Sequence, residues 1–148
     1  MENLPRRRSA VSLVLDSSVT LAWLYSDEIT EPIRRIFEEV AEQGAVVPTL
    51  WKLEIANSLT MAVRRGRIDR EFRRAALSDL AMLEITTDPH TGANAWGHTV
   101  ELADKCDLTV YDAAYLELAL RRQLPLATLD EKLRAGAAGR GVEVLGKN

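Results

Sequence analysis

The chain has 148 residues, of which 47% are apolar and 28% charged, and its formal net charge is −3. These values fit one globular domain with a sizeable core and argue against a protein that holds nucleic acid by bulk positive charge. No apolar run approaches the ~20 residues of a membrane span. The single cysteine, Cys106, excludes an internal disulfide framework. We therefore expect a cytoplasmic protein with no membrane segment.

The N-terminus carries a short run of arginines, Arg6 to Arg8, ahead of apolar residues, and in this it imitates a secretory signal. The apolar part is too short for one, ends in Asp16 and has no small-residue cleavage site. We predict a flexible basic extension over residues 1–12. With no repeat and no linker in the remainder, residues 13–148 should form a single domain.

The first structural element is an apolar run, Leu13 to Leu15, that stops at Asp16. Continuous rather than alternating hydrophobicity is typical of a parallel strand buried on both faces. Ligands of open α/β sheets lie beyond the carboxyl ends of the strands, so Asp16 stands where chemistry usually occurs. It could equally be the N-cap of the following helix.

The rest of the chain alternates between helix-like and strand-like segments. Helices are predicted at 31–43, 49–65 (capped by Thr49), 68–82, 90–105, 109–122 and 131–138, and strands at 45–47, 84–88, 124–129 and 142–145. In these helices apolar residues recur every three or four positions, which places Leu53, Phe72 and Trp96 on core-facing stripes. The alternation predicts a doubly wound α/β sheet.

Three further carboxylates are candidate site residues, and each could instead have a purely structural role. Glu54 shares a helix side with core residues, where burial is costly without a partner, but it could reach water or bond Lys52 or Asn57. Asp112 stands three residues after Thr109, the spacing of a capping box, yet it is in line with inward-facing residues. Asp130 directly follows a predicted buried strand, as Asp16 does.

Taken together, the four carboxylates are harder to explain as caps. A doubly wound sheet brings strand ends and helix starts to one edge, where such groups would repel one another unless protons or a cation neutralised them. An all-oxygen cluster with no nearby Cys or His selects a hard ion, Mg²⁺ or Mn²⁺. Ions of this kind recur in phosphoryl chemistry.

At this point a family resemblance becomes visible in four stretches. They are Val14-Leu15-Asp16-Ser17-Ser18-Val19, then Leu53-Glu54-Ile55-Ala56-Asn57, then Leu108-Thr109-Val110-Tyr111-Asp112-Ala113-Ala114-Tyr115, and finally Ala127-Thr128-Leu129-Asp130. In this order they resemble the PIN-domain nucleases, most of all the VapC ribonuclease toxins of type II toxin–antitoxin pairs. The resemblance spans residues 13 to 145; the basic N-terminal extension departs from the family pattern.

The resemblance implies a three-layer α/β/α fold on a central parallel sheet and a Mg²⁺- or Mn²⁺-dependent endoribonuclease that cleaves RNA phosphodiesters with a metal-activated water. Asp16, Glu54 and Asp112 would be the core catalytic metal ligands, and Asp130 a fourth, more variable one. Ser17 and Thr128 would support them by hydrogen bonds. The family further implies a homodimer silenced by a small cognate antitoxin.

Two other classes of function compete with this interpretation. In an aspartyl phosphatase or phosphoacceptor domain Asp16 would itself be phosphorylated, and Lys132 is the only lysine near a strand end that could meet the phosphate. In a non-catalytic PIN-like binding module the acids could be lost, whereas this chain keeps all four.

Six arginines crowd the segment from Arg64 to Arg74 in an otherwise acidic chain. Arginine's planar fork suits phosphate, although a run of charge is usually a solvated surface. We expect this segment to take part in RNA binding only if the active site faces the same way.

Overall fold

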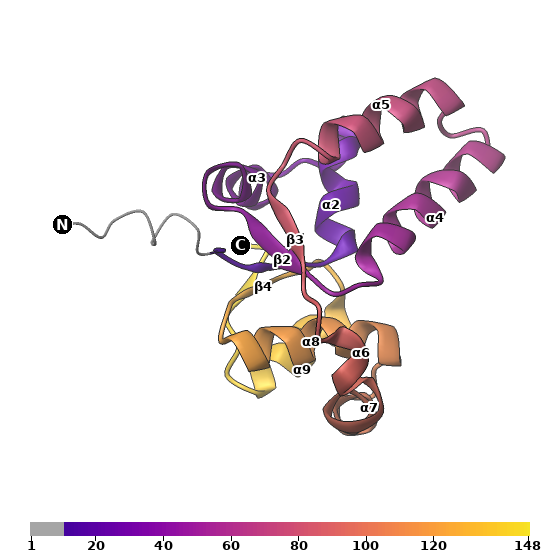
Figure 1. The fold of residues 1–148 in the computed structure, drawn as a ribbon. Helices are drawn as coiled ribbons and strands as arrows, with labels where there is room; N and C mark the ends of the chain where they lie inside the picture. The colour runs from indigo at the N-terminus through magenta and orange to yellow at the C-terminus, as the bar shows by residue number, and fades with distance from the viewer. Residues whose placement is uncertain (1–10) are drawn as a thin grey trace.

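The protein is described here by a computed structural model covering residues 11–148. Its centre is a five-stranded sheet in the order β3-β2-β1-β4-β5 (Figure 1). The strands are β1 (Val14–Leu15), β2 (Ala45–Val47), β3 (Ile85–Thr87), β4 (Leu126–Ala127) and β5 (Val144–Leu145). All four pairings are parallel, and Val14 of the central strand stands between Val46 and Leu126.

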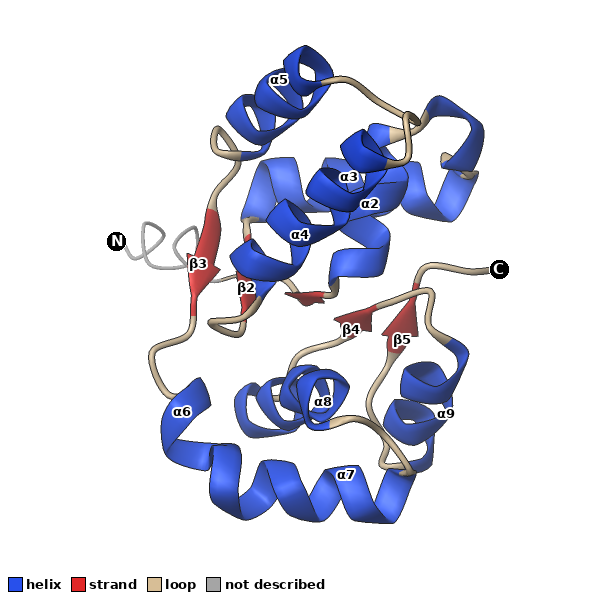
Figure 2. Cartoon of the chain, turned by 90° about the vertical axis from the view of Figure 1, so that its right-hand side faces the viewer, coloured by secondary structure: helices blue, strands red, loops and turns tan. Residues whose placement is uncertain are grey.

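Helices cover both faces of this sheet. They are α2 (Ser17–Leu24), α3 (Glu31–Gln43), α4 (Trp51–Arg64), α5 (Arg70–Leu80), α6 (Thr91–Asn94), α7 (Val100–Cys106), α8 (Val110–Arg122) and α9 (Glu131–Gly139), with a 3-10 turn η1 (Ser26–Glu28) and a π-helical segment η2 (Ala95–Thr99). Figure 2 shows α2 to α5 on one side of the strands and α6 to α9 on the other. The predicted α/β/α fold with a parallel sheet is confirmed.

The core forms where the two helical layers meet the central strand. Leu13, Val14 and Leu15 are fully buried, as a strand covered on both faces requires. Tyr115 and Leu116 of α8 belong to the same core. Because the chain enters α2 directly after β1, the carboxyl end of the central strand is also the start of a helix.

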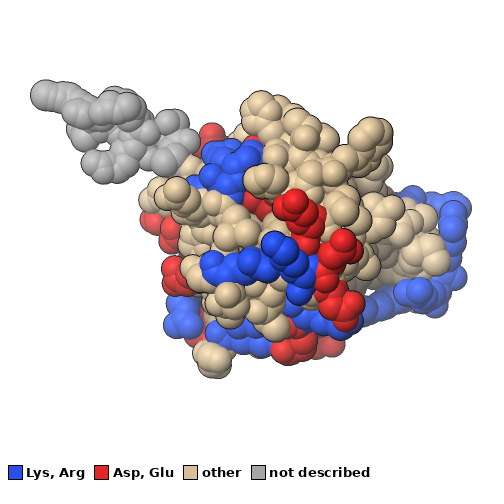
Figure 3. Space-filling view, turned by 90° about the horizontal axis from the view of Figure 1, so that it is seen from below, with Lys and Arg blue, Asp and Glu red and all other residues tan. Residues whose placement is uncertain are grey.

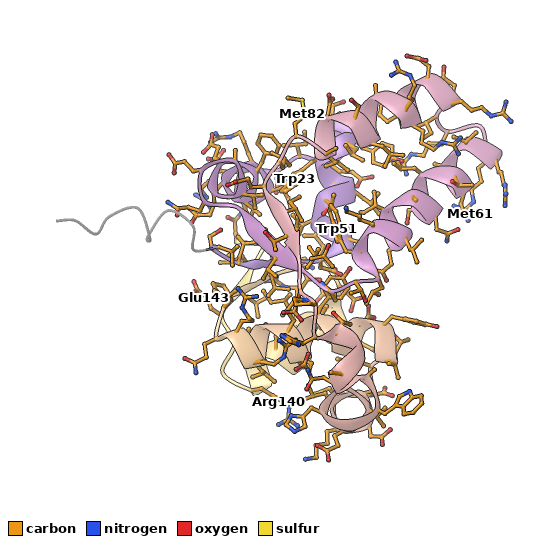
Figure 4. The ribbon with its side chains drawn as sticks, in the orientation of Figure 1. Trp23, Trp51, Met61, Met82, Arg140 and Glu143 are labelled. Atoms are coloured by element: carbon orange, nitrogen blue, oxygen red, sulfur yellow. The ribbon has the colours of Figure 1, made fainter. Side chains whose placement is uncertain are left out.

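Two helical stripes were predicted in the wrong register. On α4 the buried residues are Trp51, Ile55, Leu59 and Ala62, whereas Leu53 is 74% exposed. The large indole of Trp51 fixes this register, because it lies near α2 (Figure 4) and its N–H donates to Thr20 Oγ1 at 3.2 Å. The predicted cap Thr49 is also wrong: the helix begins at Trp51 with Leu50 at the N-cap position.

The predicted helix 90–105 is divided into α6, η2 and α7. Trp96, predicted to face the core, lies within the π-helical segment and is 95% exposed, whereas Thr99 and Leu102 are buried. The wider i→i+5 turn changes the angular spacing of residues across this segment, so a uniform 3.6-residue repeat does not describe it. Phe72 is likewise exposed and stacks on Tyr25 with ring centroids 6.3 Å apart.

The end of β3 is tied to α8 by a group of buried charges. Arg121 donates two hydrogen bonds to Asp88, at 3.2 and 2.9 Å, and two to Glu117, at 2.7 and 3.0 Å. Arg122 approaches Asp88 at 3.6 Å. Both carboxylates are almost fully buried, so the arginines neutralise charges that would otherwise be costly.

The basic extension predicted for residues 1–12 falls, up to residue 10, outside the described residues. Ser12 already contacts the domain, since its hydroxyl donates to the carbonyl of Gly44 at 2.8 Å. Among residues 11–148, no helix is both long enough and apolar enough to cross a membrane.

Candidate metal centre

The four predicted carboxylates come from two strand ends and two helix starts. Asp16 directly follows β1, and Asp130 comes three residues after β4, which is hydrogen-bonded to β1. Glu54 and Asp112 lie in the first turns of α4 and α8. The parallel sheet therefore brings all four to its carboxyl edge, as α/β topology predicts.

Asp16 is the most deeply buried of the four, with 4% of its surface exposed. It occupies the N-cap position of α2, but its side chain makes no capping bond. Instead, its Oδ2 accepts hydrogen bonds from the hydroxyls of Ser18 and Thr128, both at 2.7 Å. Burial nevertheless raises the pKa of Asp16 above its usual range.

Both hydroxyls are themselves fixed by the loop that follows β4. The backbone N–H of Leu129 donates to Ser18 Oγ at 2.9 Å, and that of Asp130 donates to Thr128 Oγ1 at 3.1 Å. Because each hydroxyl accepts from the loop, its proton is free to point at Asp16. The carboxylate is thus oriented by groups from both sides of the β1–β4 pair.

Glu54 is half-buried and held by the core residue Tyr115. The phenol of Tyr115 donates to Glu54 Oε1 at 2.5 Å, so the bonds to Lys52 or Asn57 considered from sequence are replaced by a bond across the site. Burial raises the pKa of Glu54, and repulsion from Asp16 and Asp112 raises it further. The pKa of Tyr115 is also raised, by burial and by its bond to Glu54, so it remains a donor.

Asp112 and Asp130 differ in whether their carboxylates cap the helices that begin beside them. At the start of α8 the cap is Thr109, whose hydroxyl accepts from the Asp112 N–H at 3.1 Å. The same hydroxyl lies beside the Asp112 carboxylate and acts to lower its pKa, but that carboxylate does not cap the helix. Asp130 does cap α9, accepting from the Leu133 N–H at 2.9 Å. The capping explanation therefore describes the carboxylate of Asp130 and not that of Asp112.

The electrostatics of the four carboxylates are those of a cluster without a counter-charge. Burial raises the pKa of Asp112, and so does repulsion from Asp16 and Asp130. Among the salt bridges of residues 11–148, none involves any of the four acids. Within the same residues, no three His, Cys, Asp or Glu side chains already form a compact metal-binding group.

Two supporting residues were missed from the sequence. Ser18, to which no role was assigned, donates to Asp16, whereas the predicted support Ser17 lies beside Glu54 and Tyr115, where its hydrogen bond acts to lower the pKa of Glu54. Tyr115 was noted only as a core residue in line with Asp112. Its spacing of three from Asp112 on an inward helix face was the available signal, since a buried phenol needs a hydrogen-bond partner.

Comparison with known proteins agrees with this geometry. The family model described as PIN domain matches residues 13–138. The chain is 31% identical to Ribonuclease VapC3 of Pyrobaculum aerophilum, an alignment that covers 83% of this chain and 92% of the relative. It is 30% identical to Ribonuclease VapC9 of Mycobacterium tuberculosis, covering 82% of this chain and 87% of that protein.

Among solved structures, a toxin–antitoxin complex from Klebsiella pneumoniae superposes with a TM-score of 0.57 at 15% identity, covering 86% of this chain and 94% of that one. At that identity the likeness concerns the fold alone. With the family model spanning most of the sequence, and with relatives aligned over nearly their whole lengths, the chain belongs to the PIN domain family.

Proposed function

We infer that this chain is a ribonuclease toxin of a toxin–antitoxin pair. The observation that carries the inference is the cluster of carboxylates at the carboxyl edge of the sheet, with no arginine or lysine paired to it among residues 11–148. The printed names of the aligned relatives, which are VapC ribonucleases, support the same activity. The competing aspartyl phosphatase gains no support, because Lys132 pairs with Asp107 at 3.1 Å.

We propose that the cluster holds Mg²⁺ or Mn²⁺. The donor set fits, because it consists of oxygens only, and because burial, followed by mutual repulsion, raises the pKa values of Glu54 and Asp112. Asp16, Glu54 and Asp112 would be the ligands, with Asp130 contributing a fourth. A bound ion would supply Lewis acidity to a phosphate oxygen and lower the pKa of an attacking water.

The chain's own residues prepare this site in three ways. The hydroxyls of Ser18 and Thr128 use only Oδ2 of Asp16, so the carboxylate can offer Oδ1 to a cation. The phenol of Tyr115 likewise occupies one oxygen of Glu54 and fixes its side chain. Without a cation the cluster would repel an RNA phosphate, so binding of substrate and of cation should be coupled.

Two partners belong to the same proposal. A small cognate antitoxin would silence the enzyme, in keeping with the toxin–antitoxin complex among the structural neighbours. We further propose that the protein acts on RNA in the cytoplasm and that it is a homodimer. Sedimentation of the purified chain would test the oligomeric state: a monomer across the micromolar range would contradict the homodimer.

The activity is tested by incubating purified, antitoxin-free protein with total cellular RNA and with oligonucleotides, in Mn²⁺, Mg²⁺ or EDTA. We expect cleavage with either ion and none in EDTA. Asp112→Asn should reduce cleavage more than about 100-fold, since loss of a direct ligand should exceed the 10- to 100-fold cost of losing a residue that only supports one.

Asp104→Asn is the matched control, because Asp104 is an exposed carboxylate on α7 outside the cluster. It should cleave like the wild type. Cleavage that survives both EDTA and Asp112→Asn would overturn the proposed function, and so would a folded wild type that is inert on total RNA with either ion.

A further inference from the structure

The α4–α5 hairpin carries a concentration of positive charge that the chain as a whole does not. From Arg64 to Arg74 there are six arginines and two carboxylates, Asp69 and Glu71, giving this segment +4 in a chain of net −3. The hairpin projects from the body of the molecule (Figure 1), and Lys and Arg atoms cover the projecting part at the right of Figure 3. The charge is therefore concentrated on one projecting surface.

Half of these arginines are occupied by contacts within the protein. Arg67 donates to Glu28 at 3.0 Å, and its guanidinium lies 3.9 Å above the ring of Tyr25. Arg74 pairs with Glu71, and Arg73 donates to Thr60 at 3.2 Å. These contacts fix the hairpin's two helices and its connecting loop.

The other half are presented to solvent. Arg64, Arg65 and Arg70 are exposed, and within residues 11–148 none of them forms a salt bridge. Among residues 11–148, the only side-chain hydrogen bond of Arg64 is a weak one, to the sulfur of Met61 at 3.9 Å. The fold thus holds three guanidinium groups at the end of a braced hairpin without neutralising them.

These arginines are connected to the carboxylate cluster by helix α4 itself. Glu54, Ser58, Met61 and Arg65 follow one another at spacings of four, three and four, which places them along one side of the helix. Met61 lies in the half of α4 that is remote from the sheet (Figure 4). At 1.5 Å per residue, Arg65 is about 16 Å from Glu54 along the helix axis.

We propose that Arg64, Arg65 and Arg70 bind the phosphate backbone of the RNA substrate at a point away from the bond that is cut. This inference rests on the proposed function. A strand lying along α4 would place one phosphate at the acidic cluster and a more distant one at the hairpin end. A substrate with a single phosphodiester is too short to reach from the acidic cluster to the hairpin end. Only a longer RNA can therefore contact both. Guanidinium forks suit phosphate, and the carboxylate cluster cannot attract RNA by itself.

The test uses the variant Arg64→Gln/Arg65→Gln/Arg70→Gln in the full chain. A single-stranded RNA of about a dozen nucleotides is the long probe, and bis(p-nitrophenyl) phosphate is the probe that cannot reach the hairpin. The matched control is Arg34→Gln/Arg67→Gln/Arg74→Gln, which removes the same charge from exposed arginines already paired with glutamates. Thermal melts confirm that both variants are folded.

We expect the test variant to raise KM for the RNA while kcat, and hydrolysis of the small ester, stay at the wild-type level. Binding is measured by fluorescence anisotropy in the Asp16→Asn background, which prevents cleavage. The slope of log K against log salt should fall by about 2, since each single-strand phosphate contact contributes about 0.7. At 0.1 M salt this corresponds to about 100-fold weaker binding if all three contacts are lost.

The charge-preserving variant Arg64→Lys/Arg65→Lys/Arg70→Lys should restore most of the affinity. An unchanged salt slope in the glutamine variant would overturn the inference, and so would an equal loss in the control. Weakened binding of a protein partner with intact RNA binding would also overturn it, assigning the hairpin to that partner. In each case wild-type cleavage of the RNA would leave the proposed function standing, whereas its absence would remove the proposed function itself.

Discussion

Helix α8 contributes to two groups of carboxylates, one almost fully buried and one partly buried, that differ in how their charge is compensated. At one end, Asp88 and Glu117 receive four hydrogen bonds from Arg121. At the other, Asp112 meets the field of Asp16 and Asp130, and the nearest donors are hydroxyls and a phenol. The first group is paired with arginines, and the second is paired with no arginine or lysine among residues 11–148.

The pKa values express the same difference. For Asp88, burial acts to raise the pKa, but the hydrogen bonds and charge of Arg121 outweigh it and lower the pKa below the usual value. For Asp112, burial and its acidic neighbours act in the same direction and raise the pKa. Hydrogen bonds from neutral groups therefore do not replace a counter-ion. We conclude that the first group stabilises the fold, whereas the second, which lacks a counter-ion among residues 11–148, costs stability.

The largest stability effect should come from breaking the compensated group. Arg121→Gln leaves Asp88 with only the longer contact to Arg122, and leaves Glu117 without its arginine. Removing one partner of a buried ion pair typically costs about 3–5 kcal/mol, which urea denaturation would measure. The control Arg34→Gln breaks exposed pairs with Glu31 and Glu38 and should cost about 1 kcal/mol or less. Equal costs in both variants would contradict the structural role of Arg121.

A smaller effect should follow from removing a hydroxyl of the uncompensated group. Thr128→Val keeps the shape of the side chain but deletes the donor to Asp16 Oδ2. Residues that orient a metal ligand typically contribute 10- to 100-fold to metal affinity, so we expect Mn²⁺ binding to weaken by about that factor in a calorimetric titration. Thr86→Val, on the exposed edge strand β3, should bind as the wild type does. Unchanged Mn²⁺ affinity in Thr128→Val would contradict the role of Thr128 in orienting the Asp16 carboxylate.

The smallest expected effect is on the pH dependence of stability in EDTA. Because the folded pKa of Asp112 is raised, its ionisation destabilises the apoprotein as pH rises from about 4, and the favourable contribution is present only below that range. The lowered pKa of Asp88 has the opposite sign: its contribution is present above about pH 4 and is lost on acidification.

Denaturation of two variants from pH 3 to 7 separates these contributions. Relative to the wild type, Asp112→Asn should be most favourable at pH 7 and should lose that advantage as pH falls. Asp88→Asn should be most unfavourable at pH 7 and should converge on the wild type in acid. If both differences varied with pH in the same direction, the contrast between the two groups would be wrong.

The sequence predicted one of these groups and not the other, and the reason is local. Asp16 and Asp130 follow apolar strands, and Glu54 and Asp112 begin helices, so topology alone brings them to one edge. Asp88 also follows a strand, but its partner lies 33 residues away on α8. No spacing rule links the two, and Arg121 in isolation looks like an ordinary basic residue near a helix C-terminus.

The wrong predictions of which helix faces are buried had a different origin. Leu53 and Trp96 were assigned to the core because a uniform 3.6-residue repeat fitted the apolar residues around them. In α4 the buried indole of Trp51 determines the true stripe, and Trp96 lies within a π-helical segment, to which a 3.6-residue repeat does not apply. Both depend on tertiary contacts or backbone geometry that residue spacing does not encode. Likewise Ser17 and Ser18 are equivalent in sequence, and only the fold directs Ser18 to Asp16 and Ser17 to Glu54.

The most direct test of the central claim is a calorimetric titration of metal-free protein with Mn²⁺, combined with the free energy of unfolding of the same samples in EDTA. If the four carboxylates await a cation, Asp112→Asn should weaken Mn²⁺ binding more than about 100-fold while its metal-free stability equals or exceeds that of the wild type. Asp104→Asn should change neither quantity. Wild-type affinity for Mn²⁺ in Asp112→Asn, or a metal-free Asp112→Asn that is less stable than the wild type, would contradict the account.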